Sequence, residues 1–281
     1  MGENLIKKIA TIVFVSITLF CSGIILYTVT HKPQDQAAEP APVQNVSGEE
    51  TAGEVPVGGD SEKNAVTPPP TPTPRTGNLM PYLTSGDGKV AYITFDDGPS
   101  VNTPEILEIL DRFGAKATFF VTGSNAEKYP DLVKQEADSG HTVGNHSYSH
   151  NYKAIYQSTD SFQQDVQQAY DVIAGIIGQE RTYKLFRFPG GAADGTAIKF
   201  AGTLEKMGFC YVDWNALNSD ADGKKFSLER SIQSIKDTTK GHDRVVILMH
   251  DAPAKKLTVK SLPEILEYLQ AEGYRFDPIV P

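Results

Sequence analysis

Residues 79–281 predict an α/β fold, a distorted or incomplete (β/α) barrel of about seven parallel strands. Two observations support this prediction: short β-rich runs alternate with amphipathic helical segments, and glycines stand where the helices should end. Strand-helix alternation of this kind produces a parallel sheet, which is either doubly wound or closed into a barrel. A regular eight-stranded barrel typically needs about 250 residues, so a domain of this length favours an incomplete one.

The strand segments are enriched in β-branched and aromatic residues, and the helical segments repeat apolar residues at three- and four-residue spacing. Strands are expected at residues 90–95, 117–121, 142–145, 185–188, 209–214, 245–249 and 274–276. Helices are expected at residues 103–113, 131–139, 161–177, 196–207, 228–238 and 262–271.

An uncharged segment, residues 9–29, precedes the domain. As a helix it would span about 31 Å, roughly the hydrocarbon thickness of a bilayer. We therefore expect residues 1–32 to form a cytoplasmic tip and a single-pass transmembrane anchor. Lys7 and Lys8 favour a cytoplasmic N-terminus, which places the domain outside the cell. The alternatives are a cleaved signal peptide, which gives a secreted protein, and a buried core helix.

Residues 33–78 hold nine of the chain's 18 prolines and no aromatic residue, which is typical of a disordered linker.

The net charge of −9, without a basic cluster, argues against a nucleic-acid partner, and no feature indicates a protein partner. The two cysteines, Cys21 and Cys210, lie in different parts of the chain, so the domain has no disulfide framework. Cys210 is expected to be a buried, inert thiol.

Polar residues follow several predicted strands, at the edge where parallel α/β folds place their chemistry. They are Asp96 and Asp97 after the first strand, His146 and His150 after the third, Arg187 at the fourth, Trp214 and Asp220 at and after the fifth, and His250 and Asp251 after the sixth.

His146 and His150 are four residues apart, and on one helical turn both imidazoles would share a cation, with Asp97 as third ligand. Adjacent carboxylates repel, so burying Asp96 with Asp97 also argues for a cation. The spacing alone is a weak signal, because such pairs are often surface histidines and Asp-Asp-Gly-Pro also forms solvated turns. Ser147 stands where zinc proteases carry Glu, which excludes that class.

A metal site of this kind needs a base and an acid. Asp96 adjoins the ligand Asp97 and is expected to take the proton from water. His250 is expected to act as general acid if a carboxylate, of Asp220 or Asp251, holds its other nitrogen. Arg187 either orients Asp96 or forms an ordinary salt bridge at the rim.

Five segments stand in chain order at or near the ends of predicted strands: Thr94-Phe95-Asp96-Asp97-Gly98-Pro99, His146-Ser147-x-x-His150, Arg187-Phe188-Pro189-Gly190-Gly191, residues 214–220, and Leu248-Met249-His250-Asp251. They resemble the five motifs of the polysaccharide deacetylase family, the NodB homology domain of carbohydrate esterase family 4. The resemblance covers nearly all of the predicted domain. It implies a distorted barrel and a divalent-metal enzyme that deacetylates N-acetylglucosamine polymers or acetylated xylan.

The resemblance also implies a role for each residue. Asp97, His146 and His150 would hold Zn²⁺ or another divalent ion such as Co²⁺, Asp96 would be the base, His250 the acid, Arg187 the residue that orients Asp96, and Asp220 the residue that tunes His250. On the substrate side, Gly190 would supply a backbone N–H to the oxyanion hole and Leu248 would line the pocket for the acetyl methyl group.

Two motifs depart from the family pattern. Ala221 follows Asp220 where the family has Trp, and Gly190-Gly191 stands where many relatives carry an aromatic residue. Trp214 is the residue we expect to supply the missing wall of the substrate pocket.

These features predict a membrane-anchored, zinc-dependent hydrolase of non-peptide carbon–nitrogen bonds. Its substrate would be N-acetylglucosamine-containing cell-wall polysaccharide, and the outward-facing domain favours peptidoglycan. The alternatives are an O-acetyl esterase acting on xylan-type glycans, a chitooligosaccharide deacetylase and a non-catalytic wall-binding module.

Overall fold

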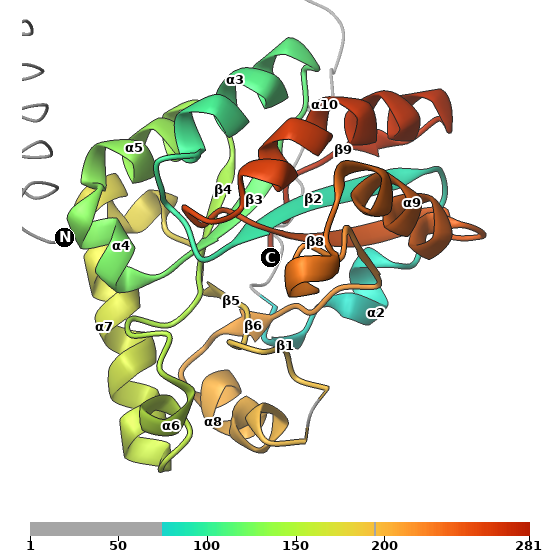
Figure 1. Cartoon of the computed structure of the whole chain (residues 1–281). Helices are drawn as coiled ribbons and strands as arrows, with labels where there is room; N and C mark the ends of the chain where they lie inside the picture. The colour runs from blue at the N-terminus through green and yellow to red at the C-terminus, as the bar shows by residue number, and fades with distance from the viewer. Residues whose placement is uncertain (1–74, 194) are drawn as a thin grey trace, which may run out of the picture. The chain divides into compact units, whose positions relative to one another are not determined.

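A curved sheet of nine parallel strands forms the centre of the computed structural model, which describes residues 75–193 and 195–281 (Figure 1). The strand order is β1-β6-β5-β4-β3-β2-β8-β7. The ninth strand, β9, lies outside this order and pairs with β2. The strands are β1 (Gly77–Asn78), β2 (Val90–Asp96), β3 (Ala117–Val121), β4 (Thr142–Asn145), β5 (Leu185–Phe186), β6 (Cys210–Tyr211), β7 (Ala216–Leu217), β8 (Arg244–His250) and β9 (Arg275–Phe276).

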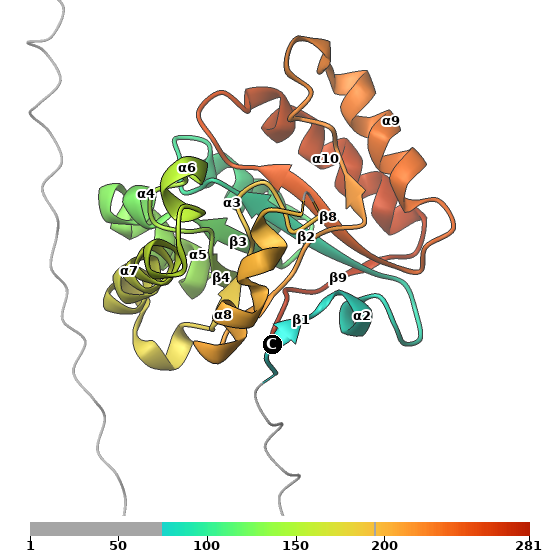
Figure 2. The same ribbon diagram turned by 90° about the horizontal axis from the view of Figure 1, so that it is seen from below.

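Helices cover the outer face of this sheet. Figure 2 shows α9 and α10 along one flank and α4, α5 and α7 along another. The α-helices are α2 (Met80–Leu83), α3 (Thr103–Arg112), α4 (Gly123–Lys128), α5 (Pro130–Asp138), α6 (Tyr152–Ile155), α7 (Thr159–Ile177), α8 (Ala201–Lys206), α9 (Leu228–Thr239) and α10 (Lys256–Ala271). Three 3₁₀-helices are η1 (Gln179–Arg181), η2 (Ala197–Phe200) and η3 (Gly223–Lys225).

Alternate residues of each strand point to opposite faces of the sheet. On β2, the odd-numbered residues from Ala91 to Phe95 pack under the helices. Val90 and Tyr92 pack instead in a second buried cluster, on the face that we call the inner face. Asp96 continues the row of Val90 and Tyr92, so the strand delivers this carboxylate to the inner face at its carboxyl end.

The predicted incomplete barrel is confirmed as a curled, open sheet whose strand order ends at β1 and β7. All seven predicted strands are present, and those at 117–121 and 142–145 have the predicted bounds. The prediction missed β1 and β7, because no run of β-branched and aromatic residues marks them, as such runs mark the equally short β5, β6 and β9. Strand β1 lies in the last two residues of the segment predicted as linker.

The predicted helices are also present, with two differences. The helix expected at 262–271 begins at Lys256 and continues through Pro263. The one expected at 196–207 is divided into η2 and α8.

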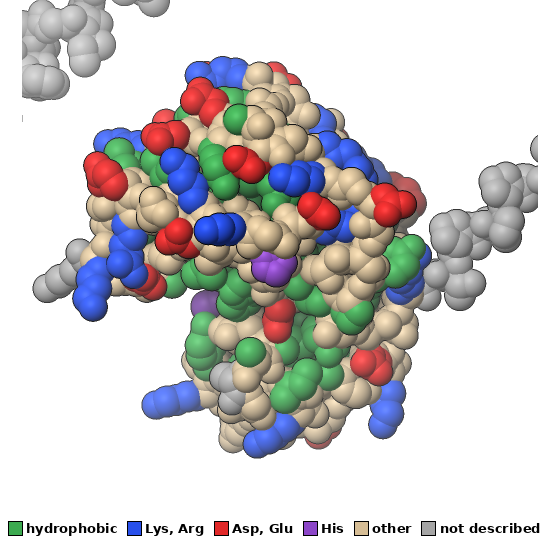
Figure 3. Space-filling model, turned by 90° about the vertical axis from the view of Figure 1, so that its right-hand side faces the viewer, with side chains coloured by type: hydrophobic (Ala, Val, Ile, Leu, Met, Phe, Trp, Pro, Cys, Tyr) green, Lys and Arg blue, Asp and Glu red, His purple; other side chains and the backbone are tan. Residues whose placement is uncertain are grey.

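None of the helices in residues 75–193 and 195–281 is long and apolar enough to cross a bilayer. The transmembrane segment predicted at 9–29 lies outside the described residues, as does the linker up to residue 74. On the face of the domain shown in Figure 3, acidic and basic side chains are interspersed over the upper part and hydrophobic side chains gather over the lower part. This face therefore presents no extended field of one charge sign.

Candidate active site

Four of the predicted site residues point to the inner face at the carboxyl ends of their strands. Asp96 ends β2 and His250 ends β8, and the two residues are register partners on neighbouring strands. His146 follows β4 and Arg187 follows β5, and β4 and β5 are themselves neighbours. Because neighbouring parallel strands lie about 4.8 Å apart, the sheet brings these side chains to one rim.

Asp97, His146 and His150 form a cluster whose ligand atoms all lie within 4.8 Å of one another. Asp97 Oδ1 lies 3.1 Å from Nε2 of His150 and 3.7 Å from Nε2 of His146. Asp97 Oδ1 is buried and accepts no hydrogen bond from any described residue. A buried oxygen without a donor, faced by two imidazole nitrogens, fits a divalent cation, so these residues could hold one.

The predicted helical turn over residues 146–150 is wrong. Ser147 and His150 have left-handed backbone conformations, with φ of 69° and 50°. Side-chain hydrogen bonds replace the helical ones, because Asn145 Oδ1 accepts from the Ser147 N–H at 2.8 Å and Ser147 Oγ accepts from the His150 N–H at 3.0 Å. The loop, and not a helix, turns the two imidazoles together, with ring centroids 5.1 Å apart.

His146 is held in the form that a metal ligand needs. Its Nδ1 lies 2.9 Å from the carbonyl oxygen of Arg187, so Nδ1 donates there and the lone pair of Nε2 faces Asp97. Burial lowers the pKa of His146 despite the opposing charges of Asp96 and Asp97, which keeps the ring neutral.

Arg187 is fully buried and binds Asp96 directly. Its Nη1 donates to Asp96 Oδ1 at 2.9 Å and to Thr94 Oγ1 at 2.6 Å. The other two guanidinium nitrogens of Arg187, Nε and Nη2, donate to the carbonyl oxygens of Val212 and Asp213, respectively. This geometry excludes an ordinary rim salt bridge. It leaves Asp96 Oδ2 facing the cluster, 3.7 Å from Nε2 of His146.

Asp220, and not Asp251, is the carboxylate beside His250. Asp220 Oδ1 lies 2.6 Å from Nδ1 of His250, and Asp220 Oδ2 accepts from the His250 backbone N–H at 2.9 Å. Thr258 also donates to Asp220 Oδ2. Burial opposes protonation of His250, but the hydrogen bond and charge of Asp220, together with the charges of Asp96 and Asp97, outweigh burial, so the pKa of His250 is raised. Asp251 points elsewhere and accepts hydrogen bonds from Ser100 and Thr103.

The predicted substrate-side residues each lie close to a residue at this rim. Leu248 lies two residues before His250 on the same face of β8 and is 7% exposed. A Cβ on Gly191 would lie 2.7 Å from the Trp214 ring, so Trp214 packs directly on this glycine. Gly190, at φ 82°, is exposed beside the Tyr152 ring. Ala221 is exposed.

Two residues that contact the predicted site were not assigned a role from the sequence. Thr94 stands inside the first motif, where its Oγ1 accepts from Arg187 and donates to the Ile247 carbonyl oxygen at 2.7 Å. Tyr152 is 46% exposed, and its ring centroid lies 5.3 Å from that of His150. Its position two residues after His150 was the sequence feature that could have indicated this contact.

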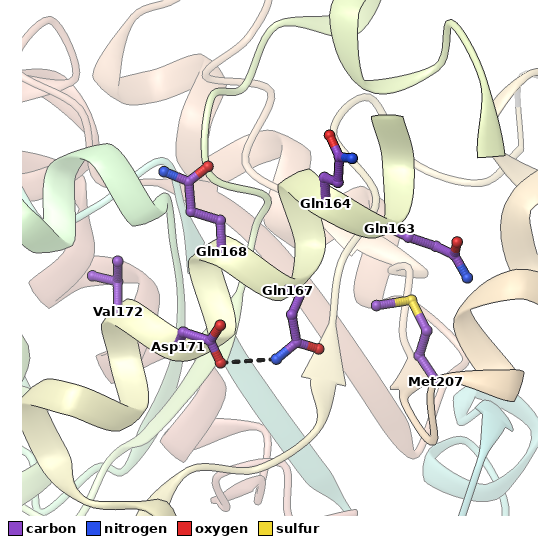
Figure 4. Close-up of a pocket in the computed structure, with 7 residues that line it drawn as sticks. All are labelled: Gln163, Gln164, Gln167, Gln168, Asp171, Val172 and Met207. Carbon is purple, nitrogen blue, oxygen red and sulfur yellow. Dashed lines mark hydrogen bonds between the residues drawn. The ribbon is translucent and has the colours of Figure 1, made fainter. Parts of the chain in front are cut away.

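A separate surface depression of about 720 Å³ lies along α7 (Figure 4). Its lining includes Gln163, Gln164, Gln167 and Gln168, and Gln167 donates to Asp171 at 2.8 Å. None of the predicted site residues lines it, so this depression is distinct from the rim site.

Comparisons with known proteins agree with the fold. Residues 84–211 match the sequence pattern of the polysaccharide deacetylase family. A Bacillus cereus peptidoglycan-N-acetylglucosamine deacetylase is 36% identical over 192 residues, which cover 67% of this chain and 68% of that protein.

Two solved structures are also similar. The catalytic domain of a peptidoglycan N-acetylglucosamine deacetylase from Eubacterium rectale has a TM-score of 0.64 and 34% identity, covering 70% of this chain and 91% of that one. A Streptococcus mutans CE4 esterase has a TM-score of 0.65 and 30% identity, covering 69% and 87%.

An open parallel barrel with paired carboxylates and imidazoles at its carboxyl rim defines a class of α/β enzymes with hydrolytic chemistry. Within that class, the chain belongs to the polysaccharide deacetylase family, carbohydrate esterase family 4, as its five motifs indicated.

Proposed function

We propose that this protein is a metal-dependent hydrolase that removes N-acetyl groups from N-acetylglucosamine-containing cell-wall polysaccharide, with peptidoglycan as its substrate. The observation that carries the proposal is the buried, donor-free Asp97 Oδ1 facing two imidazole nitrogens, beside an Arg-bound Asp96. The names of the Bacillus cereus and Eubacterium rectale relatives support peptidoglycan.

Asp97, His146 and His150 would hold the cation. Two imidazoles and one carboxylate suit Zn²⁺, and the same donor set accepts Co²⁺. When bound, the ion supplies Lewis acidity, which polarises the acetyl carbonyl and lowers the pKa of water.

Asp96 and His250 would move the protons. Asp96 accepts a proton from the water that attacks the acetyl carbon, and the bond from Arg187 fixes Asp96 for this work. His250 gives a proton to the departing nitrogen, because an amine leaves poorly without one. Asp220 favours the protonated form of His250, which is the form that an acid needs.

The substrate side would be formed by three residues. The backbone N–H of Gly190 would donate to the developing oxyanion, a role that needs no side chain. Leu248 and Trp214 would form apolar walls for the acetyl group. The family has Trp at the position of Ala221, and that residue is small and exposed here. In this proposal Trp214 therefore supplies the pocket wall instead.

The site of action is also a proposal. Residues 9–29 would anchor the chain in the cell membrane, and residues 33–78 would hold the domain, residues 79–281, near the wall outside the cell. Secretion after cleavage of this segment is the alternative.

An O-acetyl esterase is the second candidate, favoured by the similarity to the Streptococcus mutans CE4 esterase. An alkoxide leaves more readily than an amine, so an esterase would depend less on His250. The chitooligosaccharide deacetylase differs only in the glycan that it accepts. The presence of both Asp96 and Asp97 disfavours a non-catalytic wall-binding module.

Acetate release from peptidoglycan, chitin oligomers and acetylxylan tests these functions. The full chain in detergent is assayed with a chelator and then with added Zn²⁺ or Co²⁺. We expect chelator-sensitive release that is fastest from peptidoglycan. Faster release from acetylxylan identifies the esterase, and no release from any glycan overturns the enzymatic proposal.

A further inference from the structure

Asp251 directly follows His250, but its carboxylate points into the loop between β2 and α3. Oδ1 accepts a hydrogen bond from Ser100 Oγ at 2.5 Å, and Oδ2 accepts one from Thr103 Oγ1. The side chain is fully buried. The carboxylate is therefore bound to the loop that begins with Asp97.

The backbone beside Asp251 holds the same loop at both of its ends. The Asp251 N–H donates to the carbonyl oxygen of Asp96 at 2.7 Å. Asn102 Nδ2 donates to the carbonyl oxygen of Ala252 at 2.6 Å. The segment that directly follows β8 thus contacts the loop where it starts, along its length and where α3 begins.

Gly98 shows how closely the loop packs on this carboxylate. A Cβ at Gly98 would lie 2.9 Å from Asp251 Oδ2 and 3.4 Å from Asp251 Cβ. The distance between the loop and β8 is therefore set by direct contact with the Asp251 side chain.

The loop also contains a backbone conformation that needs support. Asp97 has φ of 72°, in the left-handed region that is unfavourable for residues other than glycine. On its other side the loop is held by Asn125, which donates to the Asp97 carbonyl oxygen at 2.8 Å, and by the Thr122 N–H, which donates to Gly98. Asp251 supplies the opposing contact, so the loop is fixed from both sides.

We propose that Asp251 is a positioning residue for the reaction. Through Ser100 and Thr103 it fixes the loop that carries the cation ligand Asp97 and the end of β2 that carries the base Asp96. Because Asp251 adjoins the acid His250, one residue sets the separation of base, ligand and acid. This inference rests on the proposed function, but its effect on cation affinity can be measured without turnover.

The test compares the full chain with D251N and with the matched pair T103V and T103S. Asn keeps the size of Asp251 but cannot accept both hydroxyl hydrogens, and Thr103→Ser keeps the hydroxyl that Thr103→Val removes. We expect D251N and T103V to lose about tenfold or more in kcat. Co²⁺ affinity, read from visible absorption, should weaken severalfold, with little change in KM. T103S should retain both kcat and Co²⁺ affinity.

Asp138→Asn is the control, because it removes a carboxylate from an exposed pair with Arg181 and should change none of these quantities. Wild-type kcat and Co²⁺ affinity in D251N overturn the inference. So does a loss confined to melting temperature, which would make Asp251 merely structural. If the unaltered chain releases no acetate, the proposed function fails, and Co²⁺ affinity alone then decides the inference: weakening in D251N and T103V supports it, and no change overturns it.

Discussion

Arg187 and Asp96 form an ion pair that is almost closed to water: Arg187 Nη1 lies 2.9 Å from Asp96 Oδ1, with side-chain exposures of 0% and 4%. The guanidinium lies over the Phe120 ring, with Cζ 4.2 Å from the ring centroid. The carbonyl oxygen of the same arginine accepts from His146. Arg187 therefore orients both the proposed base and one proposed ligand.

Replacing Arg187 with Met should destabilise the fold strongly. The change leaves the Asp96 carboxylate buried without its cation, and breaking a buried pair from one side costs about 3–5 kcal/mol. Urea unfolding measures this cost through the fluorescence of Trp214, the chain's single tryptophan. Arg181→Met is the matched control at the exposed pair with Asp138, where about 0–1 kcal/mol is expected. Equal losses in the two variants would contradict the importance of the buried pair.

Asp96→Asn should separate catalysis from cation binding. The amide can still accept a hydrogen bond from Arg187 but cannot take a proton from water, so acetate release should fall by about 10²–10⁴-fold. Metal content should be unchanged, because Asp97, His146 and His150 remain. His146→Ala should lose both metal and activity. A fully active Asp96→Asn protein would show that another group is the base.

Asp220→Asn should move the alkaline limit of activity to lower pH. The acid His250 works only when protonated, so activity falls as pH rises through its pKa. The Asp220 carboxylate raises that pKa, whereas burial alone lowers it. The pH profile of kcat/KM measures the shift. Thr258→Val, which removes one hydrogen bond to Asp220 but leaves its charge, should move the limit less. If the alkaline limit of Asp220→Asn equals that of the unaltered protein, the contact between Asp220 and His250 is not what raises the pKa of His250.

The sequence predicted that the side chains of the site share one rim, because a parallel sheet places the carboxyl ends of all its strands at one edge. The strand positions alone were enough to predict that Asp96, His146 and His250 lie close together. The partner of His250 was left open between Asp220 and Asp251, since it depends on how a segment 30 residues away packs against β8.

Loop geometry was the part that the sequence did not reveal. A helical turn was expected at 146–150, but the Asn145 and Ser147 side chains accept hydrogen bonds from backbone N–H groups and stabilise left-handed residues there. The contacts of Asp251 with Ser100 and Thr103 likewise join residues about 150 positions apart. Periodicity does not report contacts of this kind.

Glu136→Met should stabilise the protein. Glu136 lies on α5 and is fully buried, and neither carboxylate oxygen has a hydrogen-bond partner in the described part of the chain. A buried polar group without a partner costs about 1–3 kcal/mol, and Met fills a similar volume without that cost. Urea unfolding at neutral pH, followed by Trp214 fluorescence, measures the gain.

The pH dependence of this gain identifies its cause. Burial, with a smaller contribution from the Asp251 charge, raises the pKa of Glu136 well above 4.5. The folded state therefore holds the proton more tightly than the unfolded state, and wild-type stability falls as pH rises from about 4.5 to the folded pKa. Glu136→Met lacks this loss, so its advantage should grow over that range and be smallest at or below pH 4.5. Glu108→Met, at an exposed position of α3, is the control and should show no such trend. An advantage that is the same at every pH would show that packing, and not the buried carboxyl group, produces the gain.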